Sequence, residues 1–171
     1  MKDNMELVDI YDDNMNKTSI IKNRDEDLVE GEYHLSIHFW IINQEKILIQ
    51  KRANNKKTYP NMWSIITGGV ISSETAEEAC DRECFEEIGI KIDNKTKLGI
   101  IKRKYDFVNV FLTNKLPNIN NIIIDKEEVE KCKIIDIQTF ESMIKNKKIV
   151  DSIINEYFTY IKPLIQGGKN E

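Results

Sequence analysis

Apolar and polar residues alternate along residues 33–42 with the period of a β-strand, which predicts a central strand. The residues on one of its faces are all large and apolar: Leu35, Ile37, Phe39 and Ile41. Shorter β-prone runs, separated by turn-forming residues, occupy residues 6–11, 18–23, 47–50, 64–67, 97–103, 107–113 and 132–137. The first two runs predict an N-terminal β-hairpin inside an extension formed by residues 1–28.

The clearest helical pattern covers residues 75–88. Its apolar face consists of Ala76, Ala79, Cys80, Cys84 and Ile88. Thr75 and Glu78 have the spacing of a capping box, and Ser73 is the alternative N-cap. Gly89 follows the last apolar position and predicts the end of the helix there.

Two further helices are expected toward the C-terminus, one that begins in residues 139–144 and one over residues 150–164. Pro163 should end the second helix because proline cannot donate a backbone hydrogen bond. Residues 166–171 are expected to form a disordered tail. The order of the elements predicts an α/β (α+β) fold with a mixed sheet between helices, in one domain of residues 1–171.

Composition narrows the class of protein. The chain has 171 residues, enough for one domain with a real core, and a net charge of −4. Its charged residues are well mixed, which argues against the broad basic face of a nucleic-acid-binding protein. No apolar run has the length of a membrane span, and no signal-peptide core is present. Three cysteines do not form a disulfide framework, so we expect reduced thiols and a cytoplasmic location.

Acidic residues gather at the end of the predicted helix over residues 75–88. Glu83, Glu86 and Glu87 stand at i, i+3 and i+4, which places their carboxylates on one side of one turn. The helix dipole is already negative at this end, so Lys or Arg would be preferred there. A compensating cation would resolve the conflict, and clustered carboxylates favour a hard ion such as Mg²⁺ or Mn²⁺.

Residues 68–90 read GGVISSETAEEACDRECFEEIGI, and this stretch resembles the Nudix box. The motif asks for Gly, five free positions, Glu, seven free positions, and then Arg-Glu, an apolar residue, any residue, Glu-Glu, any residue, Gly and an apolar residue. Each fixed position matches, with Cys84 in an apolar position. The resemblance implies an α/β/α sandwich and hydrolysis of a nucleoside diphosphate linked to another group. A chance acidic surface helix is the alternative explanation of the pattern.

The resemblance also implies roles for the acidic residues of the motif. Glu83 and Glu87 match the main metal ligands, and Glu86 matches a third ligand or the base that activates water. A bound divalent ion would neutralise phosphate oxygens and lower the pKa of a bound water.

Arg82 resembles the structural arginine of the motif. It can pair with Glu86 or Glu78 at helical spacing and hold the carboxylates in place. A backbone carbonyl at Thr67 or Gly68 would complete the metal shell, because a glycine turn lets the backbone approach the ion.

Candidate residues also lie outside the motif. Glu127 or Glu128 is an outside candidate for the general base, and an exposed acidic loop is the alternative. Lys51 and Arg52 are candidates for contact with substrate phosphates, against a solvated basic loop. Trp63 is a candidate for stacking on a base or ring, although core packing is the more common role of such a residue.

Residues 30–63 resemble the corresponding part of isopentenyl diphosphate isomerases, which share the Nudix fold. His34 matches a histidine that binds metal in that family. Residues 66–70 lack the Cys and the Gly-His-Pro of the isomerases, and residues 105–110 lack their glutamates. Isomerisation of the double bond needs an acid and a base on opposite faces of the carbon skeleton. The chain is therefore interpreted as an isomerase-like Nudix hydrolase.

Three alternatives stay open beside a Mg²⁺-dependent diphosphohydrolase. One is the isomerase itself, and another is a Nudix module that senses a nucleotide without cleaving it. A third is a zinc site of Cys80, Cys84, His34 and His38, but the cysteines continue the apolar helix face and their spacing matches no common zinc pattern. The partner is expected to be a small nucleoside-diphosphate-type molecule, and the sequence leaves both a monomer and a homodimer open.

Overall fold

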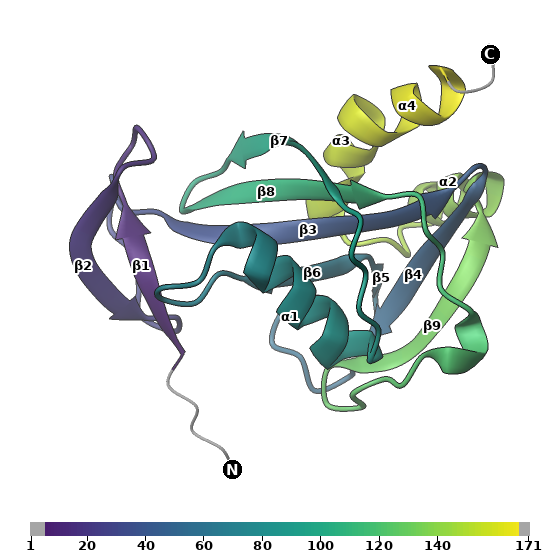
Figure 1. The fold of residues 1–171 in the computed structure, drawn as a ribbon, viewed down its shortest axis with the longest axis horizontal. Coiled ribbons are helices and arrows are strands. Elements are labelled where there is room, and N and C mark those ends of the chain that lie inside the picture. The colour runs from purple at the N-terminus through teal and green to yellow at the C-terminus, as the bar shows by residue number, and fades with distance from the viewer. Residues whose placement is uncertain (1–5, 168–171) are drawn as a thin grey trace.

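The computed structural model describes residues 6–167. Its centre is β3 (His34–Asn43), which pairs with β8 (Asp106–Thr113) in parallel and with β4 (Lys46–Arg52) and β6 (Ile66–Gly69) in antiparallel orientation (Figure 1). The other strands of this sheet are β5 (Trp63–Ser64), β7 (Thr96–Lys102) and β9 (Val129–Asp136). The predicted mixed sheet is confirmed.

Both faces of the sheet are buried. Helix α1 (Ala76–Ile88) lies on one face, where its alanines and cysteines pack on the row of apolar residues predicted for β3. Helix α2 (Ile137–Lys145) and the C-terminal helical segments supply apolar side chains to a second cluster, around Trp40 on the other face (Figure 1). Because two faces are covered, β3 carries buried side chains along both of its rows. Among residues 6–167, no helix is long and apolar enough to cross a membrane.

The predicted N-terminal hairpin is present as β1 (Leu7–Tyr11) and β2 (Lys17–Asn23), which form a separate two-stranded sheet. It is fixed to the loop that leads into α1. Asp9 accepts hydrogen bonds from Ser72 Oγ at 2.8 Å and Ser73 N at 3.1 Å. The extension therefore packs directly against the loop between β6 and α1.

Helix α1 begins and ends as the pattern predicts. The Thr75 hydroxyl accepts from Glu78 N, and the Glu78 carboxylate accepts from Thr75 N, so the capping box is complete. Ser73 is not the N-cap. Gly89 adopts a left-handed conformation with φ of 69°, which favours glycine and ends the helix.

The strand predicted over residues 64–67 is divided at Ile65. β5 pairs with β4, whereas β6 pairs with β3, so the chain changes partner strand between them. One straight strand cannot pair with both neighbours. The Ile65 carbonyl is left outside both strands and accepts from the Gln50 side chain at 3.3 Å.

The single helix predicted over residues 150–164 is wrong in detail. The chain instead forms the short segments η2 (Asp151–Ile153), α3 (Ile154–Glu156), η3 (Tyr157–Ile161) and α4 (Lys162–Gly167). The third of these is π-helical, and Lys162 N donates to Tyr157 O five residues earlier. After this wider turn, the α-helical conformation resumes at Lys162.

Pro163 does not end the helix. It lies in α4, which follows the π-helical segment directly, and the chain stays helical through Gly167. Gln166 and Gly167 are helical, so the tail predicted from residue 166 is wrong for these two. The rest of that prediction lies outside the described residues.

The connection between β8 and β9 contains the short 3₁₀ helix η1 (Ile119–Asn121). The part of the connection that follows η1 lies against the end of α1, where Ile123 N donates to Ile88 O at 3.0 Å and Asp125 N donates to Glu87 O at 3.2 Å. These bonds satisfy carbonyls that a helix end would otherwise leave free.

Candidate active site

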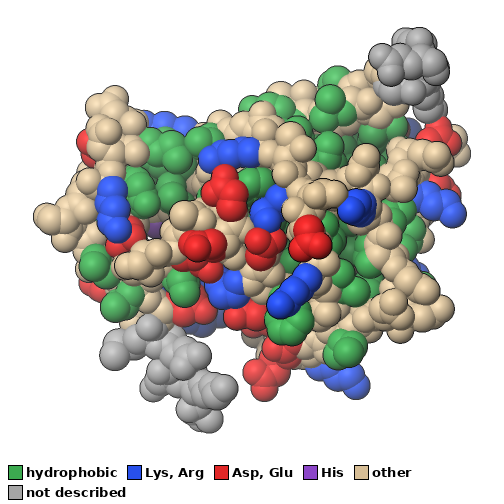
Figure 2. Space-filling model, in the orientation of Figure 1, with side chains coloured by type: hydrophobic (Ala, Val, Ile, Leu, Met, Phe, Trp, Pro, Cys, Tyr) green, Lys and Arg blue, Asp and Glu red, His purple; other side chains and the backbone are tan. Residues whose placement is uncertain are grey.

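The last two turns of α1 present two buried carboxylates and one exposed carboxylate. Glu83 is 8% exposed and Glu87 is 5% exposed, one turn apart on the side of the helix that meets the sheet. Glu86 lies between them in sequence and points to solvent. Acidic and basic side chains are intermixed over α1 on this face of the molecule (Figure 2).

The glycine turn at the end of β6 lies directly against Glu83. A Cβ on Gly68 would be 2.0 Å from Glu83 Cδ, so any side chain at this position would displace the carboxylate. A Cβ on Gly69 would be 3.2 Å from Cζ of Arg24, which follows the N-terminal hairpin. Two adjacent glycines thus leave room for a carboxylate and a guanidinium. Arg24 belongs to no sequence motif, and only its position in the fold identifies it as a neighbour of the site.

Arg82 ties the carboxylates to the glycine turn. Its guanidinium donates to Glu74 at 2.8 and 2.9 Å, to Glu83 at 2.9 Å and to Glu86 at 3.2 Å. It also donates to Gly69 O at 2.9 Å. A planar fork with donors in several directions suits this role better than lysine would.

The predicted pair of Arg82 with Glu86 is confirmed, and the alternative pair with Glu78 is wrong. Glu78 closes the capping box at the other end of α1. The main partner of Arg82 is Glu74, which sequence reasoning did not assign a role, although it occupies a fixed position of the motif.

Burial and mutual repulsion disfavour the charged forms of the two inner carboxylates. Desolvation raises the pKa of Glu83 to about 7, against an opposing effect of Arg82. Desolvation, followed by the charge of Glu83, raises the pKa of Glu87 well above its ordinary value. Glu83 has Arg82 beside it, whereas the hydrogen-bond partner of the Glu87 side chain is the neutral amide of Gln50, so the pair keeps raised pKa values.

Gln50 is a second residue that sequence reasoning missed. Its Nε2 donates to Glu87 Oε2 at 2.6 Å, and the side chain is 3% exposed. The clue was a polar residue that continues the apolar run of residues 47–49. Because strand residues alternate between faces, Gln50 and Arg52 point to the α1 side of β4. The charge of Arg52 accordingly opposes the rise in the pKa of Glu87, as the smallest of its causes.

Glu128 lies near Glu87, as its charge raises the pKa of that residue. It forms an ion pair with Lys56, and its backbone carbonyl accepts from Ala53 N at 3.0 Å. Glu127, the other candidate base, donates its backbone N–H to Asp125 Oδ1 at 2.9 Å. The structure therefore brings Glu128 into the electrostatic environment of the carboxylate pair.

Lys51 and Trp63 lie on the opposite face of the sheet from Glu87. The two residues are directly paired between β4 and β5, and Trp63 packs against the cluster around Trp40. Lys51 forms an ion pair with Glu130 at 2.7 Å. These two candidate substrate contacts are separated from the carboxylates by the sheet.

The residues of the imagined zinc site are not brought together. Cys80 and Cys84 are buried in the core cluster under α1. His38 lies on the other face, with Nδ1 2.7 Å from Glu156 Oε2. His34 Nδ1 is 3.2 Å from Leu35 O. Across residues 6–167, no three His, Cys, Asp or Glu side chains form one ligand group, and this includes the three glutamates of the motif.

The residues at the end of α1 fit a hydrated magnesium ion. Mg²⁺ in proteins keeps several waters and is usually held by one or two carboxylates together with substrate phosphates. Glu83 and Glu87 supply two carboxylates, and the backbone of Gly68 lies directly against Glu83. Such a site needs no cage of three protein carboxylates.

Comparison with known proteins agrees with this geometry. The family described as "NUDIX domain" matches residues 32–154. An uncharacterised Nudix hydrolase of Listeria monocytogenes is 31% identical over 143 residues, which cover 81% of this chain and 85% of that protein. An isopentenyl-diphosphate Delta-isomerase of Salmonella heidelberg is 34% identical over only 65 residues, 37% of this chain and 36% of that protein.

The fold has close counterparts among solved structures. A crystal structure from Deinococcus radiodurans superposes with a TM-score of 0.74 at 19% identity, over 88% of this chain and 96% of that chain. At this level of identity the likeness concerns the fold alone.

Proposed function

This chain belongs to the Nudix family, and we propose that it hydrolyses a diphosphate linkage in a nucleoside diphosphate or a nucleoside-diphosphate-linked compound, with Mg²⁺ or Mn²⁺ as cofactor. The observation that carries the proposal is the pair of buried carboxylates one helical turn apart, Glu83 against the Gly68 backbone and Glu87 with raised pKa, for which Arg82 supplies a cation to Glu83 alone. A buried like-charge pair is costly unless a ligand compensates it.

Glu83 and Glu87 would hold the metal ion, with Glu86 as a third ligand or as the base and the carbonyl of Gly68 as a backbone ligand. When bound, the ion neutralises phosphate oxygens and lowers the pKa of a coordinated water. Arg82 orients Glu83 and Glu86 through the hydrogen bonds that also reach the glycine turn.

Residues beyond the motif complete the proposed site. Arg52 is a candidate for binding substrate phosphate, since it lies on the side of β4 that faces Glu87. Glu128 is the candidate base outside the motif, and release from Lys56 would free its carboxylate. Lys51 and Trp63, which lie on the other face of the sheet, are not part of this proposed site.

The test is release of phosphate from a panel of nucleoside di- and triphosphates, nucleotide sugars, dinucleoside polyphosphates and isoprenyl diphosphates. Each reaction is run with Mg²⁺, with Mn²⁺ and with a chelator, and an auxiliary phosphatase is added where the product requires one. Metal-dependent turnover of any nucleotide supports the proposal and names the substrate class. Tight nucleotide binding without turnover would instead support a sensing module, and conversion of isopentenyl diphosphate would support an isomerase.

A further inference from the structure

Two buried side-chain oxygens in residues 6–167 have no hydrogen-bond partner, Gln50 Oε1 and Asn109 Oδ1. Both residues belong to the sheet, and they are 3% and 1% exposed. An unpaired acceptor in the interior is costly, so each such group calls for an explanation. The two amides differ in what their nitrogen contacts.

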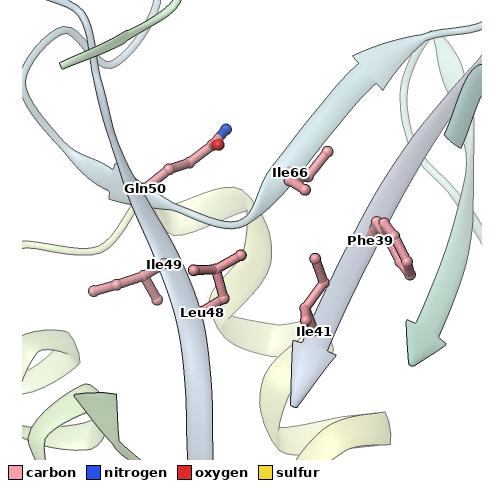
Figure 3. Close-up of a pocket in the computed structure, with 6 residues that line it drawn as sticks. All are labelled: Phe39, Ile41, Leu48, Ile49, Gln50 and Ile66. Carbon is pink, nitrogen blue, oxygen red and sulfur yellow. The ribbon is translucent and has the colours of Figure 1, made fainter. Parts of the chain in front are cut away.

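The orientation of the Gln50 amide follows from its neighbours. Its Nε2 lies 2.6 Å from Glu87 Oε2 and 3.3 Å from the Ile65 carbonyl, which can only accept. The NH₂ group must therefore face them, and the carbonyl oxygen must face away. Gln50 also lines a small pocket whose other lining residues are apolar: Phe39, Ile41, Leu48, Ile49 and Ile66 (Figure 3). The Gln50 carbonyl oxygen is left without a partner because the NH₂ group of the same amide is oriented toward Glu87.

Gln50 is held on a rigid support. It is paired with Ser64 of β5 on one side and with Cys132 of β9 on the other, so its backbone is fixed between two strands. Glu87 lies in the last turn of α1, where its backbone carbonyl accepts from Asp125 N at 3.2 Å and its side chain reaches across to β4. A donor fixed in the sheet can hold that carboxylate in one orientation.

Asn109 is the other buried amide with an unpaired oxygen, but its nitrogen has different partners. Its Nδ2 donates only to backbone carbonyls, Ser36 O at 3.2 Å and Phe107 O at 3.4 Å. No hydrogen bond links it to Glu83 or Glu87. It shares with Gln50 the burial and the unpaired oxygen, but not the contact with a carboxylate.

We propose that Gln50 is a positioning residue of the active site, whose amide N–H holds Glu87 in the orientation in which this carboxylate binds the divalent cation. The inference rests on the proposed function. An apolar side chain of similar size would leave no unpaired oxygen, but it would remove the donor from Glu87 Oε2 and from the Ile65 carbonyl. The contact with Glu87 is the shorter of the two, at 2.6 Å against 3.3 Å.

The experiment measures binding of Mn²⁺ alone to the full chain by titration calorimetry, with no substrate present. The variants are Gln50→Met and Gln50→Leu, with Asn109→Leu as the matched control, and thermal unfolding checks that each is folded. We expect both Gln50 variants to bind Mn²⁺ about 10- to 100-fold more weakly, as is typical when a partner of a metal ligand is removed. Asn109→Leu should bind within about twofold of wild type, because it touches no proposed ligand.

A double-mutant cycle with Glu87→Gln separates positioning from a general effect on the core. If Gln50 acts through Glu87, Gln50→Met should have no further effect on Mn²⁺ affinity in the Glu87→Gln background. In steady-state turnover, Gln50→Met should lower kcat at saturating Mn²⁺ and leave the substrate KM nearly unchanged.

Unchanged Mn²⁺ affinity in both Gln50 variants would overturn the inference and leave the proposed function standing. An equal loss in Asn109→Leu, or full additivity in the cycle, would also overturn it. Failure of the wild-type chain to bind Mn²⁺ would overturn the proposed function, and this inference with it.

Discussion

Two buried glutamates on opposite faces of the sheet are satisfied in different ways. Glu156, which is 1% exposed, accepts from Trp40 Nε1 and lies 2.7 Å from His38 Nδ1, so each of its oxygens has a partner. Glu87, which is 5% exposed, has the single amide of Gln50 and a second buried carboxylate beside it. The first arrangement is complete without a ligand, and the second is not.

The difference separates structural from functional burial of charge. Glu156 joins the C-terminal helical segment to β3, since both His38 and Trp40 lie on that strand. Glu87 joins α1 to β4, yet it keeps a raised pKa because its surroundings disfavour a charge. Removal of each side chain should therefore have opposite consequences for stability and for activity.

Glu156→Leu should destabilise the fold by about 3–5 kcal/mol, the usual cost of removing one partner from a buried polar pair. The variant leaves His38 and the Trp40 indole without their acceptor. The free energy of unfolding is obtained from urea denaturation of the variant and the wild type. Unchanged stability would show that the contact is incidental and would remove the contrast with Glu87.

Glu87→Gln should abolish nearly all turnover and leave the protein folded. Loss of one proposed metal ligand is expected to lower kcat/KM by roughly 10²–10³-fold, or about 3–4 kcal/mol of transition-state stabilisation. Stability in the absence of metal should stay the same or rise, because the substitution relieves repulsion with Glu83. An active Glu87→Gln protein, or an unfolded one, would count against the assignment.

The metal-free protein should lose stability as the pH rises from about 4.5 to about 7. Burial raises the pKa of Glu83 from an ordinary 4.5 to about 7, so its stabilising protonated form is fully present only below 4.5. The loss from this one group is about 3 kcal/mol. Groups with lowered pKa, such as Asp9, act in the opposite direction at acidic pH, so the comparison is with Glu83→Gln.

The measurement is the free energy of unfolding between pH 4.5 and 8, with and without Mg²⁺. Glu83→Gln should show a flatter profile than wild type in the chelated protein. Saturating Mg²⁺ should restore stability to the wild type at pH 8 and not to the variant, because the ion stabilises the charged carboxylate. Parallel profiles of the two proteins would contradict a titrating Glu83.

The features of the site that lie within α1 could be predicted from the sequence. The capping box, the Gly89 terminus and the spacing of Glu83 and Glu87 are local patterns, and local patterns fix local structure. The glycine that must accommodate Glu83 was also placed, because it belongs to the same motif.

The other features depend on contacts between distant parts of the chain. His38 and Glu156 are 118 residues apart, and Gln50 and Glu87 are 37 apart. Such pairs follow from strand order and from which helix covers each face of the sheet, neither of which periodicity encodes. The basic pair Lys51 and Arg52 divides between the two faces because β4 extends through Arg52, whereas the predicted strand ended at residue 50.

The smallest expected effect concerns Arg24, which extends the contrast to the N-terminal extension. Arg24 lies over Gly69 and lowers the pKa of Glu83, and it is 44% exposed in an ion pair with Glu6. Arg24→Ala should raise the KM for a diphosphate substrate severalfold, or by about 1 kcal/mol, because a cation at the rim of the site attracts anionic substrate. The value of kcat should change little.

Lys22→Ala is the matched control for Arg24→Ala. Lys22 lies in β2, two residues before Arg24, and its ammonium group pairs with Glu32 and donates to Asp27 O instead of lying against Gly69. The increase in KM should appear only in the Arg24 variant, and it should shrink at high salt because mobile ions screen the interaction. Equal KM values in the two variants would show that the extension supports the loop before α1 without taking part in binding.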